Sequence, residues 1–353
     1  MRRPPIPPRL QRPLGRLVRE ARSGLANSGT VPLKRQLELW RHGFYSQNAH
    51  FYDFDTHGFG AYVSDFQRAT GLERINDPIQ RALLNDKLVA FLYLRAVGAP
   101  TPTVYGYSNG DHLVVFDDAP AQDIEGLLKA TGRLVVKPRG GSGGSRFSLL
   151  EQDGDTTLVN GRTDGDLRAC LRGRVVVSEF IEQHPYARDI HRHTTNTMRL
   201  LVLRDSDTGE PFVTAATHRF GTERSFPVDN IGRGGMSAGV DVDTGVLGPL
   251  AAVPAVPGPI RWHDAHPETG APVRGTSVPR WPEIVDEVRR VTTTLEGLHC
   301  VGWDVAVTED GFQIIEGNNR PDTSMQLHGP FLTDERSRRV FEAHGVVPRS
   351  GRR

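Results

Sequence analysis

The segment VVKPRGGSGGSRF, residues 135–147, combines one lysine with four glycines in five positions. Glycine lets several backbone N–H groups point at one place, a geometry that suits anionic oxygens. Ser142 and Ser145 add hydroxyl donors, and Lys137 adds a positive charge. Because the lysine precedes the glycines, this is not a Walker A loop. The segment predicts a phosphate-binding loop, with a flexible hairpin loop as the alternative.

A second segment, GWDVAVTEDGFQIIEGNNRPD at residues 302–322, predicts two strands joined by a tight turn. Such a hairpin brings Asp304 beside Glu316, and Glu316 and Asn318 share a face because alternate residues of a strand do. Carboxylate and amide oxygens without His or Cys suit Mg²⁺ held together with phosphates. The alternative is a solvated acidic hairpin. The apolar neighbours argue against it, because they draw these carboxylates toward a partly buried site.

Lysine is rare in this chain: Lys34, Lys87, Lys129 and Lys137 are the only four among 43 basic residues. An ammonium group places a compact charge on a phosphate where a planar guanidinium does not fit. Lys87 follows Asn85 and Asp86, which predict a helix N-cap, so its charge opposes the helix dipole. This position suggests a role outside the helix. A lysine that covers apolar surface with its stem is the alternative.

The stretch VVVSEFIEQHP, residues 175–185, predicts a buried strand that ends near Glu179. Backbone groups at such an end can pair with the edge of a base. Taken alone, the stretch is better interpreted as an ordinary core strand.

The helices and strands that would position these segments can be predicted from the sequence. Residues 33–98 are predicted to be helical, and from residue 103 short strands alternate with helices, which predicts an α+β protein with mixed or antiparallel sheets. We expect a helix at 164–171 capped by Thr163, a strand at 240–242, ordered coil at 246–280 and a helix at 282–298.

Composition excludes several classes of protein. The first 22 residues hold seven arginines against one glutamate, and the remainder is slightly acidic, which gives no case for nucleic-acid binding. Two cysteines are too few for a disulfide framework. Four prolines interrupt the longest apolar stretch, residues 246–260, so it cannot span a membrane. The arginine-rich start lacks the apolar core of a secretory signal. We expect a cytoplasmic protein.

Taken in order, the motifs resemble those of the ATP-grasp superfamily: DK opening a helix, VVKP with its glycine-rich loop, SEFIE, and D…E-x-N. The segments TTNTMRLLVLR, GGMSAGVDVDTG and HPETGAPVRGTSVPRW resemble the sugar-transfer-associated ATP-grasp family, which is close to α-L-glutamate-ligase-like sequences. The resemblance covers roughly residues 40–335. It implies two α+β lobes that clasp ATP.

The resemblance also implies residue roles. Lys87 and Lys137 would hold the α- and β-phosphates, and the loop over the β- and γ-phosphates would comprise Gly140, Gly141, Ser142, Gly143, Gly144 and Ser145. Glu179, with the backbone of Phe180 and Ile181, would bind adenine. Glu182 or Asp189 would bind the ribose. One or two Mg²⁺ ions would be held by Asp304, Glu316 and Asn318.

The implied activity is that of an ATP-dependent carboxylate–amine ligase, which forms an amide through an acyl phosphate in secondary-metabolite or polysaccharide-associated biosynthesis. Related ligases often carry an oxyanion-stabilising arginine two residues before the first metal carboxylate, where this chain has Gly302. Arg199, Arg320 and Arg233 are the candidates to replace it. The missing arginine leaves open a kinase that phosphorylates a small-molecule hydroxyl. A nucleotide-binding interaction module is a third reading, which the lysine pair and metal-type residues disfavour.

We expect five regions: an Arg/Pro-rich arm (1–30), a helical region (31–102), a lid subdomain with the glycine-rich loop (103–190), a catalytic subdomain (191–335) and a basic tail (336–353). The helical region stands where related enzymes have a Rossmann-like subdomain. The expected partners are small-molecule or peptidic carboxylates and amines, without nucleic acid or membrane. A homodimer is compatible with the sequence.

Overall fold

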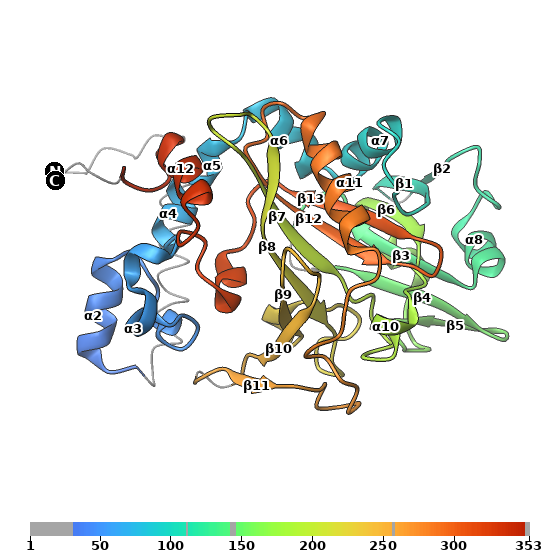
Figure 1. The fold of residues 1–353 in the computed structure, drawn as a ribbon. Coiled ribbons are helices and arrows are strands. Elements are labelled where there is room, and N and C mark those ends of the chain that lie inside the picture. Colours follow the sequence, from blue (N-terminus) through green and yellow to red (C-terminus); the bar gives the residue numbers. More distant parts are fainter. Residues whose placement is uncertain (1–30, 111, 142–145, 256–257, 350–353) are drawn as a thin grey trace, which may run out of the picture.

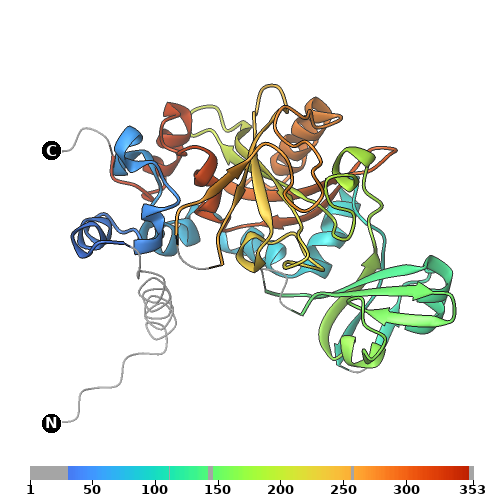
Figure 2. The same ribbon diagram turned by 90° about the horizontal axis from the view of Figure 1, so that it is seen from below.

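The computed structural model describes residues 31–349 except 111, 142–145 and 256–257. A helical region opens the described chain, a large sheet lies in the middle, and a small sheet lies at the other end (Figures 1 and 2). The opening helices are α2 (Leu33–Arg41), α3 (Phe54–His57), α4 (Asp65–Thr70), α5 (Leu72–Ile75), α6 (Pro78–Asn85) and α7 (Lys87–Ala96), with 3₁₀ turns η1 (Ser46–Ala49) and η2 (Phe59–Ala61).

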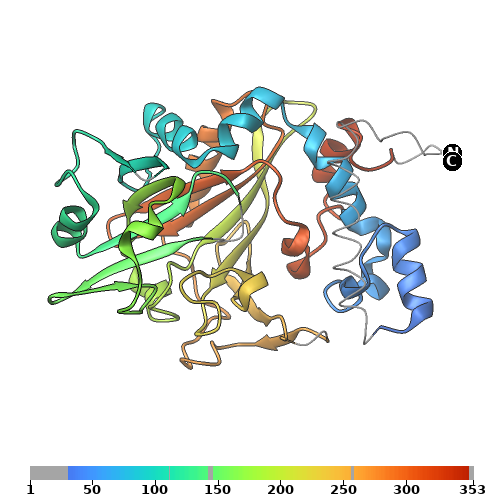
Figure 3. The same cartoon turned by 180° about the vertical axis from the view of Figure 1, so that it is seen from behind.

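Helices α6 and α7 run from the helical region toward the small sheet (Figure 3). Local sequence explains why they are two helices. Asp77 accepts a hydrogen bond from the N–H of Ile79 at the start of α6, where Pro78 fits because its first position needs no N–H donor. Asp86 ends α6 and caps α7 by accepting from the N–H of Leu88. The predicted N-cap before Lys87 is therefore confirmed.

The small sheet has six antiparallel strands in the order β2-β1-β6-β3-β4-β5. Its elements are β1 (Val104–Gly110), β2 (Leu113–Val115), α8 (Ile124–Thr131), β3 (Arg133–Pro138), β4 (Ser148–Asp153), β5 (Thr156–Val159), α9 (Leu167–Cys170) and β6 (Gly173–Glu179). Leu134 and Val136 of β3 pack with Leu127 of α8. Because strand residues alternate between faces, Val135 and Lys137 lie on the face away from α8.

The large sheet has seven antiparallel strands in the order β11-β10-β9-β8-β7-β12-β13. Its elements are α10 (Pro185–Arg188), β7 (Met198–Arg204), β8 (Pro211–Phe220), η3 (Ile231–Arg233), β9 (Met236–Val240), β10 (Leu247–Ala252), β11 (Arg261–His263), α11 (Trp281–Thr293), β12 (Cys300–Val307), β13 (Phe312–Asn318), η4 (Thr323–His328) and α12 (Glu335–Ala343). One face packs on α11, where Ile284 and Val288 contact the core around Trp303. On the other face, Leu201 and Leu203 pack with Phe341 of α12.

Asn76, just before α6, joins the helical region to the strands of the large sheet. Its side-chain amide donates to the carbonyls of Cys300 (2.6 Å) and Asn319 (2.9 Å), and its oxygen accepts from the N–H groups of His299 (2.8 Å) and Cys300 (2.9 Å). Asn76 is 3% exposed, and these four bonds use its full hydrogen-bonding capacity. The start of β12 and the residue after β13 are thereby fixed to one side chain.

Several local predictions were wrong. The helix expected at 164–171 is only α9, and Asp166 rather than Thr163 caps it, because the Asp166 carboxylate accepts from the N–H groups of Arg168 and Ala169. The strand expected at 240–242 is β9, which ends at Val240. The helix expected at 282–298 is α11, which ends at Thr293.

The expected coil at 246–280 contains β10 and β11. Prolines argued against strands there, but Pro249 lies where the register between β10 and β9 shifts, so no ladder bond requires its missing N–H. Part of the expected basic tail is helix α12, with Val340 and Phe341 buried. No helix in the described part of the chain is long and apolar enough to cross a membrane.

Candidate active site

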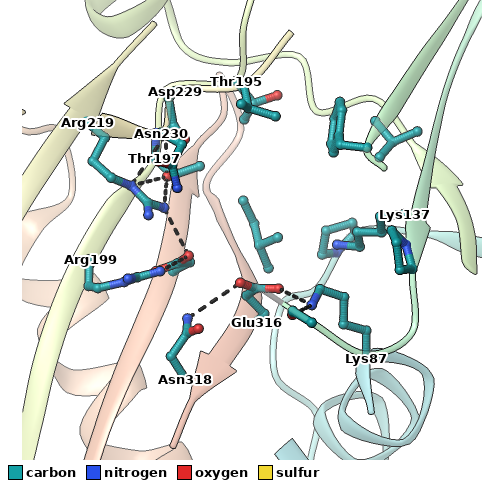
Figure 4. Close-up of a pocket in the computed structure, with 18 of the residues that line it drawn as sticks. Lys87, Lys137, Thr195, Thr197, Arg199, Arg219, Asp229, Asn230, Glu316 and Asn318 are labelled. Atoms are coloured by element: carbon teal, nitrogen blue, oxygen red, sulfur yellow. Dashed lines mark hydrogen bonds and ion pairs between the residues drawn. The ribbon is translucent and has the colours of Figure 1, made fainter. Parts of the chain in front are cut away.

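A row of charged side chains crosses four neighbouring strands of the large sheet, on the face away from α11. Arg219 comes from β8, Arg199 from β7, Asp304 from β12 and Glu316 from β13. Asp304 is the register partner of Arg199 on one side and of Glu316 on the other. Asn318 follows Glu316 at the next position of the same face. The predicted juxtaposition of Asp304, Glu316 and Asn318 is therefore present. Figure 4 shows Glu316 and Asn318 opposite Lys87.

Two arginines hold the Asp304 carboxylate. Arg199 donates from Nε to Oδ1 and from Nη2 to Oδ2, both at 2.7 Å, and Arg219 Nη2 donates to Oδ2 at 2.9 Å. Asp304 is 4% exposed. Burial alone would raise the pKa of its carboxyl group, but the two guanidinium groups outweigh burial and hold that pKa at about 2. Asp304 is therefore ionised at neutral pH.

Gly302 explains how Arg199 reaches this position. A Cβ atom on Gly302 would lie 3.4 Å from Cδ of Arg199 and 3.1 Å from Cβ of Pro321. The stem of Arg199 therefore occupies the space beside Gly302 that a side chain at this position would enter. The guanidinium group of Arg199 thus lies next to the Asp304 carboxylate. It comes from the neighbouring strand β7 and not from position 302 of β12.

Two lysines face this row from the other side. Lys87 is the first residue of α7, and its Nζ lies 3.3 Å from Oε2 of Glu316 and donates to the carbonyl of Gly141 at 3.0 Å. Lys137 comes from β3. Burial lowers the pKa of Lys137; Glu316 opposes this effect and Lys87 adds to it. Among the described residues, Lys137 Nζ has no ion pair within 4.0 Å.

Asp86 and Arg139 attach α7 to the small sheet. Arg139 donates to Asp86 from Nη2 at 2.7 Å and from Nε at 3.0 Å, and the N–H of Lys87 donates to the carbonyl of Arg139 at 2.8 Å. Gly140 and Gly141 follow Arg139 directly. The lysine of α7 and the start of the glycine-rich loop are thus held together, which accounts for a lysine in an electrostatically unfavourable first turn.

One cavity of about 290 Å³ contains this site. Its walls come from the face of the small sheet away from α8, the face of the large sheet away from α11, and the start of α7. Basic and acidic side chains are nearly balanced in its lining: Arg68, Lys87, Lys137, Arg199, Arg219 and Arg320, against Glu179, Asp229, Asp304, Glu316 and Asp322.

The end of β6 forms another part of the cavity. Oε1 of Glu179 accepts from the N–H of Thr103 (3.0 Å) and from Nε2 of Gln313 (2.9 Å). Ile181 is buried and lines the cavity. Within the described chain, the backbone N–H and C=O of Ile181 form no backbone–backbone hydrogen bond. These groups are free to bind the edge of a planar polar ligand.

The structure brings together most, but not all, of the predicted residues. The cavity is lined by Lys87, Lys137, Gly140, Gly141, Glu179, Ile181, Arg199, Asp304, Glu316, Asn318 and Arg320. The remaining described candidates do not line it: Phe180, Glu182, Asp189 and Arg233. Ser142, Gly143, Gly144 and Ser145 lie outside the described residues.

The candidates away from the cavity have other contacts. The ring of Phe180 lies under the guanidinium of Arg133, with 4.2 Å between Cζ and the ring centroid, and Glu182 forms an ion pair with the same arginine. Asp189 lies near Arg188, and its side chain is 71% exposed. Arg233 is exposed in η3.

Several cavity residues were not predicted from the sequence. Asp229 accepts from the N–H (2.8 Å) and the hydroxyl (2.5 Å) of Thr197, and Arg219 donates to the same hydroxyl. Arg68, Thr195, Asn230 and Asp322 also line the cavity without having been predicted. Asp229 and Asn230 precede the GRGG segment, and that glycine-rich neighbourhood was the available signal.

The donor set fits a hard divalent cation with few protein ligands. Glu316 has only long contacts, with Lys87 at 3.3 Å and with Nδ2 of Asn318 at 3.5 Å, so its oxygens retain free acceptor positions. No group of three or more Cys, His, Asp or Glu side chains suited to a metal occurs in the described chain. A cation here would therefore complete its coordination with Asn318, phosphate oxygens and water.

Many solved structures are similar to this chain, including the following three. The ATP-grasp ligase PsnB, complexed with a minimal precursor, is 15% identical with a TM-score of 0.41, and the match covers 77% of this chain and 63% of PsnB. D-alanyl-alanine synthetase A from Vibrio cholerae is 12% identical, with a TM-score of 0.47 and coverage of 76% and 67%. N5-carboxyaminoimidazole ribonucleotide synthetase from Thermotoga maritima is 15% identical, with a TM-score of 0.36 and coverage of 76% and 51%. The chain thus spans less than two thirds of PsnB, and no curated protein sequence matches it.

Most of the chain matches the model of one protein family. It matches residues 67–339, a range that includes α6, α7, both sheets and every residue that lines the cavity. The two antiparallel sheets with the cavity between them are the two lobes of the ATP-grasp fold, as the sequence predicted. The chain belongs to the sugar-transfer associated ATP-grasp family.

Proposed function

We propose that this protein is an ATP-dependent carboxylate–amine ligase. The observation that carries the proposal is the opposition of Lys87 and Lys137 to Asp304 and Glu316 across a single cavity. Cations on one wall and metal-type carboxylates on the other suit a polyphosphate with its divalent cation between them. Membership of the ATP-grasp family supports ATP as that polyphosphate.

In this proposal the nucleotide lies along the cavity from Ile181 to Glu316. The free backbone groups of Ile181 bind the adenine edge, and Glu179 lies beside them. Lys137 and Lys87 neutralise phosphate oxygens, and the N–H groups at Gly140 and Gly141 stand at the same place. A phosphate supplies Lys137 with the anionic partner that its surroundings lack.

Glu316, Asn318 and Asp304 would hold Mg²⁺. When bound, the ion neutralises charge on the phosphates during phosphoryl transfer. Glu316 is the more accessible carboxylate, since Asp304 already accepts three hydrogen bonds from arginine. The pairing of β12 with β13 keeps the two carboxylates fixed relative to each other.

The proposed reaction has two steps. A substrate carboxylate attacks the γ-phosphorus of ATP and ADP leaves, giving an acyl phosphate; an amine then attacks the acyl carbon, loses a proton and displaces phosphate. Arg199 is bound to Asp304 through both Nε and Nη2, and Arg233 lies away from the cavity. Arg320, which lines the cavity without an ion pair to any described carboxylate, is therefore our choice to stabilise the oxyanion of the second step.

The test is Mg²⁺-dependent ADP release against pooled carboxylates and amines, including peptides, with and without hydroxylamine. Release coupled to hydroxamate formation supports an acyl phosphate and hence the ligase. Release that yields a phosphorylated hydroxyl and no hydroxamate contradicts it and supports a kinase. Glu316→Gln is the negative control for the site, and Glu309→Gln, in the turn of the same hairpin, is the matched control.

A further inference from the structure

Arg219 lies between two buried carboxylates and contacts both. Its Nη2 donates to Oδ2 of Asp304 at 2.9 Å, and its Nε lies 3.6 Å from Oδ2 of Asp229. Both nitrogens also donate to the hydroxyl of Thr197, Nε at 3.1 Å. The side chain is 12% exposed. One guanidinium group therefore has Asp304 as a partner in the charged row and two partners, Thr197 and Asp229, beyond it. Figure 4 shows Arg219 beside the latter two.

The contact with Asp304 limits what that carboxylate can bind. A carboxylate offers about four acceptor positions on its two oxygens. Arg199 uses one position on each oxygen, and Arg219 uses the second position on Oδ2. A divalent cation at Asp304 then finds one free position, on Oδ1, and is repelled by the nearby guanidinium charges. Glu316 has no comparable restriction, because its contacts are long.

Arg219 can release Asp304 without becoming unpaired. The Thr197 hydroxyl accepts from it and donates to Asp229 at 2.5 Å, and the N–H of Thr197 also holds Asp229 at 2.8 Å. These contacts stay in place if Nη2 leaves Oδ2 of Asp304. The released side chain keeps a hydroxyl and a carboxylate as partners, and incoming phosphate oxygens add negative charge to the same cavity.

We propose that Arg219 is a positioning residue that makes metal binding depend on the nucleotide. In the nucleotide-free protein it occupies Asp304 and weakens the affinity of the row for a divalent cation. When phosphates enter, it shifts toward Thr197 and Asp229, and Asp304 becomes available. This inference rests on the proposed function, because it takes Asp304 and Glu316 as the metal ligands.

The test measures Mn²⁺ binding by the electron paramagnetic resonance signal of free Mn²⁺, on the full chain, with and without ADP and corrected for Mn²⁺ held by free ADP. Arg219→Met should bind Mn²⁺ without nucleotide about tenfold more tightly than the wild type, the factor that one charge-assisted hydrogen bond is worth. The gain in affinity on adding ADP should shrink by a similar factor. Arg219→Lys keeps the positive charge but not the paired N–H donors of the guanidinium group, so its Mn²⁺ affinity should lie between those of the wild type and Arg219→Met. This variant provides the test if Arg219→Met does not fold.

Arg261→Met, an exposed arginine of β11 outside the cavity, is the matched control and should behave as the wild type. A merely structural role for Arg219 would weaken Mn²⁺ binding in both states. If both Arg219 variants bind nucleotide-free Mn²⁺ no more tightly than the wild type, this inference is overturned and the proposed function stands. If the wild type binds no Mn²⁺ even with ADP, the metal assignment fails and the inference falls with it.

Discussion

Replacing Lys137 by methionine should make the nucleotide-free protein more stable and the nucleotide complex weaker. The ammonium group lies in the cavity wall, where burial lowers its pKa, and no described carboxylate lies within 4.0 Å of it. Methionine has a similar length and no charge to desolvate. Removing a partly buried, unpaired charge should raise the free energy of unfolding by about 1 kcal/mol at neutral pH. For a chain of this size that is about 2 °C in melting temperature.

The same substitution removes the cation that we assign to the phosphates. Loss of a charge-assisted contact in a closed site should weaken ADP binding about a hundredfold. At saturating ADP, the ligand-induced gain in stability should then fall by about 2.7 kcal/mol. Thermal unfolding with and without Mg²⁺ and ADP measures both effects in one experiment. Lys129→Met, an exposed lysine of α8 in the same lobe, is the matched control and should change neither value.

The pH dependence gives a further check. A lysine whose pKa is lower in the folded state binds fewer protons there than in the unfolded chain, so its burial penalty falls as pH rises. The stability difference between Lys137→Met and the wild type should therefore narrow at alkaline pH. A variant that melts below the wild type without nucleotide, or that keeps wild-type ADP affinity, would refute this reasoning.

Three other outcomes are expected. Glu316→Gln should weaken Mg²⁺-dependent ADP binding by about tenfold or more in calorimetry, while Mg²⁺-free binding changes little, since it removes one of the two carboxylates that we propose hold the ion. Arg320→Ala should slow amide formation more than ADP formation; equal losses would contradict its oxyanion role. The Arg336 guanidinium holds the pKa of Asp205 at about 2, so the stability from this pair is present above the ordinary value of 3.8 and is lost as pH falls toward 2. Urea unfolding should accordingly show Asp205→Asn destabilised at neutral pH, with a deficit that disappears in acid.

The sequence was most informative where local spacing determines geometry. A short hairpin pairs Asp304 with Glu316 whatever the rest of the chain does, and this pairing is confirmed. The unfavourable position of Lys87 at a helix start suggested a role outside the helix, and its Nζ lies 3.3 Å from Oε2 of Glu316 in the cavity. The α+β class and the helical opening region also follow from local periodicity.

Residues brought in by long-range strand pairing could not be predicted in the same way. Arg219 reaches Asp304 because β8, β7 and β12 are neighbours in the sheet, an order that no local spacing encodes. Asp229 acts through Thr197, which lies 32 positions away in sequence. The sequence also could not show that another residue binds a candidate side chain. Phe180 and Glu182 both contact Arg133 and do not line the cavity.

The four hydrogen bonds of Asn76 bear on how such enzymes could be recombined. A chimera that took residues 31–102 from a related enzyme would remove the amide that holds His299, Cys300 and Asn319. A junction placed before residue 76 would retain it, together with the close approach at Gly297, where a Cβ would lie 2.5 Å from that of Asp77. In modular terms, α6 and α7 belong with the large sheet, and so does α5, because Leu72 and Ile75 pack with Leu201 and Leu203.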